Sequence, residues 1–124
     1  MIEPLFIVTN NPLSKKAFEG KYDIIFVDGD VMDVLTLVRD KIHLGYKLLT
    51  HPLMSSVKPN ETPYRTICLS KEKQNLDMQS LEVIESAIFT TKKFLKDFDI
   101  PKWNEKILKD FQVIDCDLIS HAID

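Results

Sequence analysis

The sequence predicts an α/β fold: a small three-layer sandwich in which a mainly parallel sheet of about four strands is flanked by helices. Three observations favour this class. Short apolar runs alternate along the chain with segments of helical periodicity. The run at 23–29 is apolar without alternation, which is typical of a strand covered on both faces. The chain has 124 residues, the size of one domain, so we expect 1–124 to form a single α/β domain.

Four short segments are expected to form the sheet, namely 5–9, 23–29, 46–50 and 66–70. The connection between the third and the fourth contains no obvious helix, although parallel neighbours are usually joined through one. Two alternatives therefore stay open. Either the fourth strand runs antiparallel to the third, or the connection contains a short helical turn.

Two helices are predicted in the first half of the chain. Asn11 is a favourable N-cap for a helix over 12–19, with Pro12 at its first position and Gly20 beyond its end. A second helix follows, with Asp30 as its cap. Its expected buried stripe consists of Val31, Val34, Leu35, Val38 and Ile42.

Two longer helices are predicted in the second half. One begins near Asp77 and ends before Pro101, which cannot continue a helix. Its expected stripe consists of Leu81, Ile84, Ile88, Leu95 and Phe98. The other follows, with a break near Gln112 left open, and its stripe consists of Trp103, Ile107, Phe111, Ile114, Leu118 and Ala122. Trp103 is expected to anchor the core or an oligomer interface.

Composition and charge exclude several classes of protein. The net charge of −3 argues against a general nucleic-acid binder, which needs a basic surface. No apolar run reaches the roughly 18 residues of a membrane span, and the start, MIEPLFIVTN, lacks the basic region of a signal peptide. We therefore expect a cytoplasmic protein with no nucleic-acid or membrane partner. Cys68 and Cys116 form no CxxC pair and are expected to be reduced, partly buried thiols.

Polar residues are predicted to meet at the carboxyl edge of the sheet, where open parallel sheets bind ligands. Asn10 and Asn11 follow the first strand, and His51 follows the third. If the first and third strands are neighbours, Asn10 and His51 face the same crevice. Asn11 also precedes a helix, whose free N–H groups favour an anion.

A proline-rich loop, THPLMSSVKPNETPYRT at 50–66, concentrates hydrogen-bonding side chains. Pro59 and Pro63 restrict its backbone, so less entropy is lost when the loop orders around a ligand. Lys58 supplies positive charge, which favours a small anionic ligand such as an amino acid or a phosphorylated compound. The candidate ligand-binding residues are Asn10, Asn11, His51, Ser55, Ser56, Lys58, Asn60, Glu61, Thr62 and Tyr64.

Each candidate also has a structural interpretation. Asn11 suits a helix cap, Asp28 and Asp30 suit a turn and a cap, and the loop suits a segment that packs on itself or on a second copy. His51 or Glu61 as an acid or base would make the chain a small enzyme, and no catalytic residue is assigned. We expect no metal and no cofactor, because the histidines lack ligand spacing and the chain has no glycine-rich fingerprint.

Three segments carry a resemblance to a known family: TNNP at 9–12, DVLTLVRDKIHLGYKLLTHPL at 33–53 and SVKPNETPYRTICLSKEK at 56–73. Together they resemble the GrdX family, small proteins encoded beside the glycine, sarcosine and betaine reductase components of amino-acid-fermenting anaerobes. The resemblance implies a cytoplasmic accessory or regulatory role in that fermentation, with reductase subunits as partners. It carries no established catalytic residue over to this chain.

Two function classes follow from the sequence, and a third is weaker. In the first, the protein binds a small anionic metabolite at the carboxyl edge of the sheet. In the second, it is a protein-interaction or dimerisation module without a ligand of its own. The proline-rich loop and the Trp103 helix would then dock on a reductase subunit or on a second copy, as a homodimer. The third is the small enzyme that uses His51 or Glu61.

Overall fold

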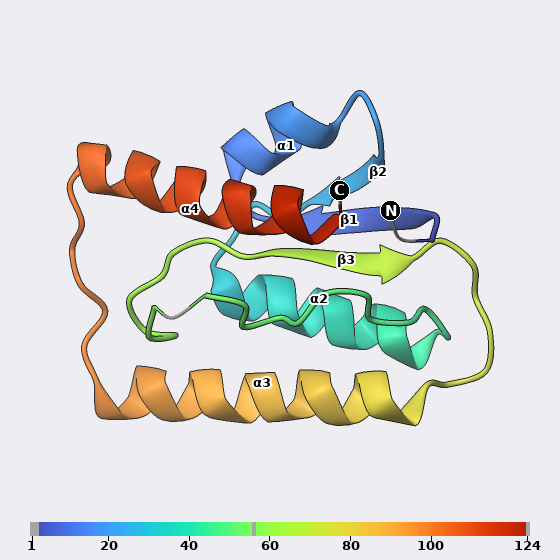
Figure 1. The fold of residues 1–124 in the computed structure, drawn as a ribbon. Helices are drawn as coiled ribbons and strands as arrows, with labels where there is room; N and C mark the ends of the chain where they lie inside the picture. Colours follow the sequence, from blue (N-terminus) through green and yellow to red (C-terminus); the bar gives the residue numbers. More distant parts are fainter. Residues whose placement is uncertain (1–2, 56, 124) are drawn as a thin grey trace.

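The computed structural model describes residues 3–55 and 57–123. Within these residues it has four helices and a three-stranded mixed sheet (Figure 1), so the predicted α/β class is confirmed. Ser56, one of the candidate residues, lies outside the described residues. The elements are β1 (Leu5–Thr9), α1 (Pro12–Phe18), β2 (Asp23–Phe26), α2 (Val31–His43), β3 (Thr66–Ser70), α3 (Met78–Asp97) and α4 (Glu105–Ile123).

The sheet differs from the predicted one in strand number and direction. Its order is β2-β1-β3, with β1 parallel to β2 and antiparallel to β3. The expected strand at 46–50 contributes a single bridge, between Leu48 and Leu69. The N–H of Leu48 points away from β3 and donates to the side-chain oxygen of Ser80 at 2.9 Å. The expectation of about four mainly parallel strands is therefore not confirmed.

This strand order separates two residues that were expected to share a crevice. The bridge at Leu48 places 46–50 beside β3, so β3 stands between that segment and β1. The first and third predicted strands are thus not neighbours, and the condition for a crevice shared by Asn10 and His51 is not met. His51 lines grooves with residues of α3, including Val83.

Burial distinguishes β1 and β3 from β2. Every residue of β1 and of β3 is buried. β2 ends at Phe26, and both Asp23 and Phe26 are exposed because this strand lies at the sheet edge. We expected 23–29 to be covered on both faces, but β1 and β3 are the strands that are covered in this way.

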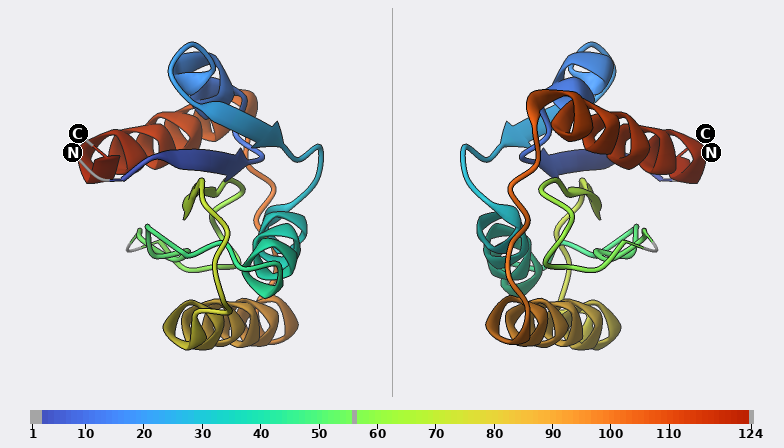
Figure 2. Two further views of the ribbon diagram at one scale, coloured as in Figure 1. Left: turned by 90° about the vertical axis from the view of Figure 1, so that its right-hand side faces the viewer. Right: turned by 90° about the vertical axis from the view of Figure 1, so that its left-hand side faces the viewer.

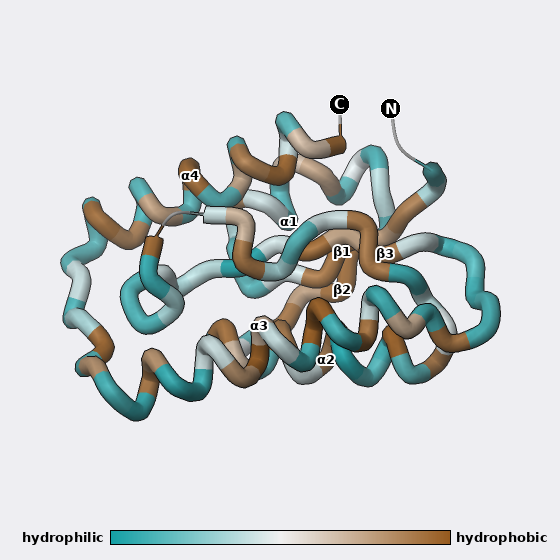
Figure 3. Tube along the Cα trace, turned by 60° about the horizontal axis from the view of Figure 1, so that its bottom comes forward, coloured by the Kyte–Doolittle hydropathy of each residue, from teal (hydrophilic) through white to brown (hydrophobic). Residues whose placement is uncertain are grey.

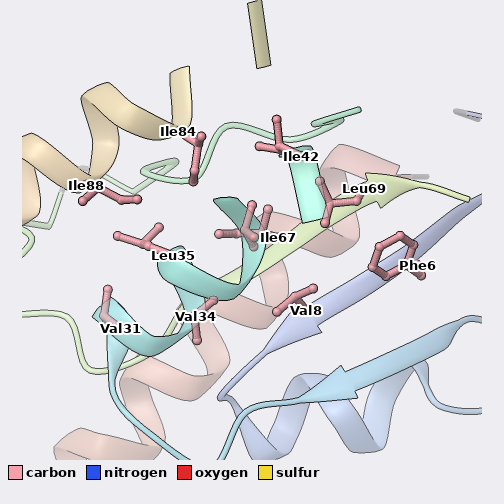
Figure 4. Packing of buried hydrophobic residues seen from close by; sticks show 11 residues of the cluster. Phe6, Val8, Val31, Val34, Leu35, Ile42, Ile67, Leu69, Ile84 and Ile88 are labelled. Carbon is pink, nitrogen blue, oxygen red and sulfur yellow. The ribbon is translucent and has the colours of Figure 1, made fainter. Parts of the chain in front are cut away.

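The helices form a layer on each side of the sheet (Figure 1 and Figure 2). α1 and α4 cover one face, and α2 covers the other with α3 packed against it. The hydrophobic cluster on the α2 side joins α2, α3, β1 and β3 and includes Leu35, Ile67 and Ile84 (Figure 4). The cluster on the α4 side includes Ile7 and Ile119. Burial of these apolar side chains holds the three layers together.

The first three helices begin as predicted. The side chains of Asn11, Asp30 and Asp77 cap α1, α2 and α3 by accepting backbone N–H groups of the first turn. Apolar positions recur along α2 and α3 at helical spacing (Figure 3), and the predicted stripe of α2 is buried. Phe98 departs from the prediction for α3, because it follows the end of the helix and is 50% exposed.

α4 is one continuous helix through Gln112, and its buried stripe differs from the predicted one. Cys116, Ile119 and Ile123 are buried, whereas Ile114 is 45% exposed. The stripe is displaced because Asp115 faces the end of the sheet, where its carboxylate is hydrogen-bonded. No described helix combines the length and the apolar character that crossing a membrane requires.

Candidate functional site

Asn10 fixes the proline-rich loop at 50–66 to the end of β1. Its amide nitrogen donates to the carbonyl oxygens of Gly29 and Pro63 at 3.1 and 2.9 Å. Its side-chain oxygen accepts the N–H of Arg65 at 2.9 Å. Asn10 is buried, and both amide hydrogens are used within the protein. The structure therefore gives this candidate a clamping role.

Asn11 belongs to a buried polar cluster between α1, the end of the sheet and α4. Its side-chain oxygen accepts the N–H of Leu13 at 3.0 Å, as predicted for a helix cap. Its amide nitrogen donates to the carbonyl of Gln112 at 2.9 Å and to the carboxylate of Asp115 at 3.0 Å. The hydroxyl of Thr66 donates to the same carboxylate. The donors of Asn11 are thus also used internally.

Asp115 and Arg65 bring opposite charges into this region. Burial raises the pKa of Asp115, while the hydrogen bonds from Thr66 and Asn11 act to lower it. Burial lowers the pKa of Arg65, and the charge of Asp115 opposes that shift. Arg65 is 4% exposed, and its Nε and Nη2 have no hydrogen-bond partner in the described part of the chain. Each charge therefore reduces the cost of burying the other.

The loop is also bound to the connection between α3 and α4. Asn60 donates through Nδ2 to the carbonyl of Asp99 at 3.0 Å. Trp103 donates through Nε1 to the carbonyl of Glu61 at 2.8 Å, and its ring centre lies 5.4 Å from that of Phe111. Trp103 therefore anchors the loop, a role that differs from the predicted ones, and it belongs to neither hydrophobic core cluster.

His51 and Lys58 do not join the other candidates in one site. His51 is exposed, and its Nδ1 accepts the N–H of Leu53 at 3.0 Å. Lys58 is exposed, with its Nζ 5.7 Å from the centre of the Phe98 ring. One side chain therefore lies beside α3, and the other lies over the residue that follows α3.

Ser55 and Tyr64 lie near the buried polar cluster. The hydroxyl of Ser55 accepts the N–H of Val57 at 3.3 Å and lies 3.5 Å from Nη1 of Arg65. The hydroxyl of Tyr64 accepts from Nε2 of Gln112 at 2.9 Å. Both side chains are half-buried, so they connect the loop to the interior.

A cleft of about 310 Å³ lies between the proline-rich loop, the start of α2 and the end of α3. Two candidates from the loop, Asn60 and Thr62, line it. The remaining wall is mostly apolar and includes Val31, Met32, Pro59, Pro63, Leu95 and Ile100. Because α2 begins just beyond β2, the cleft lies at the carboxyl edge of the sheet, where the sequence predicted a ligand.

Two polar features border this cleft. Asn60 is 7% exposed, and its Oδ1 has no hydrogen-bond partner among the described residues. Buried polar atoms without partners are rare and call for an explanation such as a bound molecule. At the start of α2, Asp30 and Asp33 form a capping box, with both hydrogen bonds at 2.9 Å. The cleft is thus bordered by the first residues of α2 and by Asp30, whose carboxylate caps that helix.

Sequence reasoning missed three residues of the polar region, Arg65, Gln112 and Asp115. Arg65 follows the candidate residues of the loop directly, and its apolar neighbours at 67–69 indicated a strand entry where a charge becomes buried. The signal for Asp115 is its place one residue before Cys116 and four before Ile119, within a helical stripe that is buried. For Gln112 we find no signal in the sequence.

The two cysteines are buried free thiols, as expected. Burial raises the pKa of Cys68 to about 12, and burial also raises the pKa of Cys116. Among the described residues, no group of three or more His, Cys, Asp or Glu side chains is placed to hold a metal ion.

The fold and the clamped loop define a small α/β protein with a cleft at the carboxyl edge of its sheet. The chain belongs to the GrdX-like protein family, whose family model matches residues 6–124. The family expected from the motifs is thereby confirmed. No curated protein and no solved structure matches the chain.

Proposed function

We propose that this protein is a cytoplasmic accessory or regulatory protein of glycine, sarcosine or betaine reductase-type fermentation that binds a small molecule. Membership of the GrdX-like family supports the proposed role. One structural observation supports the proposed binding of a small molecule. The proline-rich loop and the start of α2 enclose a cleft of about 310 Å³ beside Asn60, whose buried Oδ1 has no partner in the described chain.

The lining of the cleft favours a ligand with both an acidic group and an alkylated, positively charged group. The first N–H groups of α2, at Val31 and Met32, favour a carboxylate. The carboxylate of Asp30 at the same wall favours a positive charge. The apolar side chains of Leu95 and Ile100 favour methyl groups. A methylated amino acid combines all three, and it keeps the acidic group that the sequence predicted.

The test is the thermal stability of the full chain against glycine, sarcosine, betaine, acetyl phosphate and phosphate. A ligand that binds the folded state alone, at a hundredfold excess over its dissociation constant, stabilises it by about 2.7 kcal/mol. For a chain of this size that is a shift of roughly 10 °C. We expect the largest shift with sarcosine or betaine.

Single substitutions test whether the ligand binds in this cleft. Ile100→Trp fills the cleft from its exposed rim and is expected to abolish the shift, whereas Ile114→Trp, on the outside of α4, is expected to keep it. Lys58→Ala removes the positive charge of the loop. If this variant loses the thermal shift, the acidic group of the ligand binds Lys58 and not the start of α2. A shift that survives Ile100→Trp contradicts the assignment to this cleft.

A second candidate function is an interaction module that docks on a reductase subunit. It is favoured by exposed apolar side chains at the end of α3, where Phe98 is 50% and Ile100 is 68% exposed. Absence of a thermal shift with every compound, together with capture of a purified reductase component, supports this candidate. The enzyme that uses His51 or Glu61 ranks third, and its test is a turnover that is lost in His51→Ala.

A further inference from the structure

The outer face of α3 carries a large exposed aromatic side chain at the middle of the helix. Phe89 is 72% exposed, while its neighbours Ile84 and Ile88 are buried against α2 and the sheet (Figure 4). A single exposed ring is ordinary on a protein surface. The charges that surround Phe89 are what set this face of α3 apart.

Charged residues are arranged in mirrored order about Phe89. Glu82 and Glu85 stand seven and four positions before it, and Lys93 and Lys96 stand four and seven positions after it. All four are exposed. At about 100° per residue, each lies within about 40° of the direction of Phe89 around the helix axis. One face of α3 thus has an acidic half, an aromatic centre and a basic half.

These charges are poorly compensated within the chain. Glu82 and Glu85 are like charges one turn apart, and so are Lys93 and Lys96, which is unfavourable in an isolated helix. The helix dipole favours this order of charges only within the first and last turns, and Glu85 and Lys93 lie nearer the middle. Glu85 is 3.4 Å from Arg39 of α2, an exposed pair of small energetic value.

A second copy of the same helix, packed antiparallel, supplies the opposite charges. When a two-fold axis passes beside Phe89, each residue before Phe89 comes level with the residue equally far after it in the other copy. Glu82 then lies at the height of Lys96 of the second copy, and Glu85 lies at the height of its Lys93. The two Phe89 rings meet at the axis. The face is therefore complementary to itself, as a two-fold interface requires.

We propose that the outer face of α3, centred on Phe89, is a homodimer interface in which two chains pack their α3 helices antiparallel. The occupant is a second copy, because the mirrored order of charges matches this same face. One helix face per chain is less than the roughly 1,600 Å² of a standard stable interface, so the dimer is expected to be weak and dependent on concentration. This inference is independent of any ligand in the cleft.

Sedimentation equilibrium of the full chain over a concentration series tests the dimer. We expect a monomer–dimer equilibrium that weakens as salt is added, because exposed charge pairs are screened. The double variant Glu82→Lys/Glu85→Lys places like charges across the interface and is expected to raise the dissociation constant by about a hundredfold or more. Phe89→Ser is expected to weaken the dimer as well, by removing its apolar centre.

The control and the complementary variant make the test specific. Glu105→Lys/Asp110→Lys changes the net charge equally on exposed positions of α4 and is expected to leave the dimer intact. The variant Lys93→Glu/Lys96→Glu is expected to be monomeric alone.

An equimolar mixture of the two α3 double variants is expected to form a heterodimer, because one copy then presents lysines and the other glutamates. Circular dichroism confirms that each variant is folded. A wild-type chain that is monomeric throughout the series overturns the proposal. A dimer that persists in both double variants, or a mixture that stays monomeric, also overturns it.

Discussion

The side-chain oxygen of Asn10 accepts the backbone N–H of Arg65 at 2.9 Å, across 55 positions of sequence. The same amide donates to the carbonyl oxygens of Gly29 and Pro63, and both of these residues line the cleft. One buried side chain thus connects the end of β1, the start of α2 and the proline-rich loop. The shape of the cleft depends on a residue that lies outside its lining.

Replacing Asn10 is expected to destabilise the fold. Asn10→Ala leaves two carbonyl groups and one N–H without their partner, which we expect to lower the free energy of unfolding by about 3 kcal/mol. Urea unfolding measures the change. Asn75→Ala, at an exposed position between β3 and α3, serves as the control. Equal unfolding midpoints for the two variants would show that the clamp contributes nothing.

The indole N–H of Trp103 is expected to keep the loop in place. Trp103→Phe removes the donor to the carbonyl of Glu61 and retains an aromatic ring beside Phe111. We expect a loss of about 1 kcal/mol in stability, because one hydrogen bond is removed and the packing is largely kept. Amide hydrogen exchange is expected to accelerate over 58–62 and to stay unchanged in β1. Unaltered exchange in the loop would contradict the anchoring role.

Asp115 is expected to make stability depend on pH. Burial raises its pKa in the folded state above the ordinary 3.8, so the folded chain holds this proton more tightly than the unfolded chain does. The stabilisation is complete below the ordinary value and is lost as pH rises through the raised one. Between the two values, the free energy of unfolding falls by up to about 1.4 kcal/mol per pH unit.

Comparison with Asp115→Asn isolates this dependence. The asparagine cannot ionise, so the stability of wild type relative to the variant is expected to decline with rising pH above 3.8. Asp117→Asn, at an exposed neighbouring position, is the matched control for the loss of one carboxylate. If the difference in stability between wild type and Asp115→Asn does not change with pH over this range, Asp115 is not the source of the pH dependence.

The thiols are expected to be inert in the folded protein. Cys68 is fully buried with a pKa of about 12, so at pH 8 about one molecule in ten thousand carries its thiolate. A thiol-specific reagent is expected to modify both cysteines promptly in denaturant and neither of them under native conditions over the same time. Rapid native labelling of Cys116 alone would instead reveal local opening between α4 and α1.

The features that the sequence predicts well are local ones. The caps Asn11 and Asp30 and the stripe of α2 depend on residues a few positions apart, and the structure has them as predicted. The proline-rich motif is also read within one segment, and it identified the family. Such features need no knowledge of which segments meet in space.

The features that sequence reasoning missed depend on distant segments. The partners of the Asn11 amide, Gln112 and Asp115, lie more than a hundred positions away in α4. The segment 46–50 has the apolar character of a strand, yet it forms an isolated bridge with β3, between Leu48 and Leu69. Neither contact leaves a periodic signal, so the composition of the cleft could be predicted only in part, through Asn60 and Thr62.

The position of β3 has a consequence for how the chain is made. β3 lies between β1 and 46–50, although it is synthesised after both, and Thr9 meets Thr66 across 57 positions. A nascent chain that has not reached residue 70 therefore carries β1 with an open apolar edge, which is an aggregation hazard. Pairing over such a distance also slows folding. Truncated products that end before Thr66 are thus expected to accumulate as aggregates, while the ribosome-released full chain closes its own sheet.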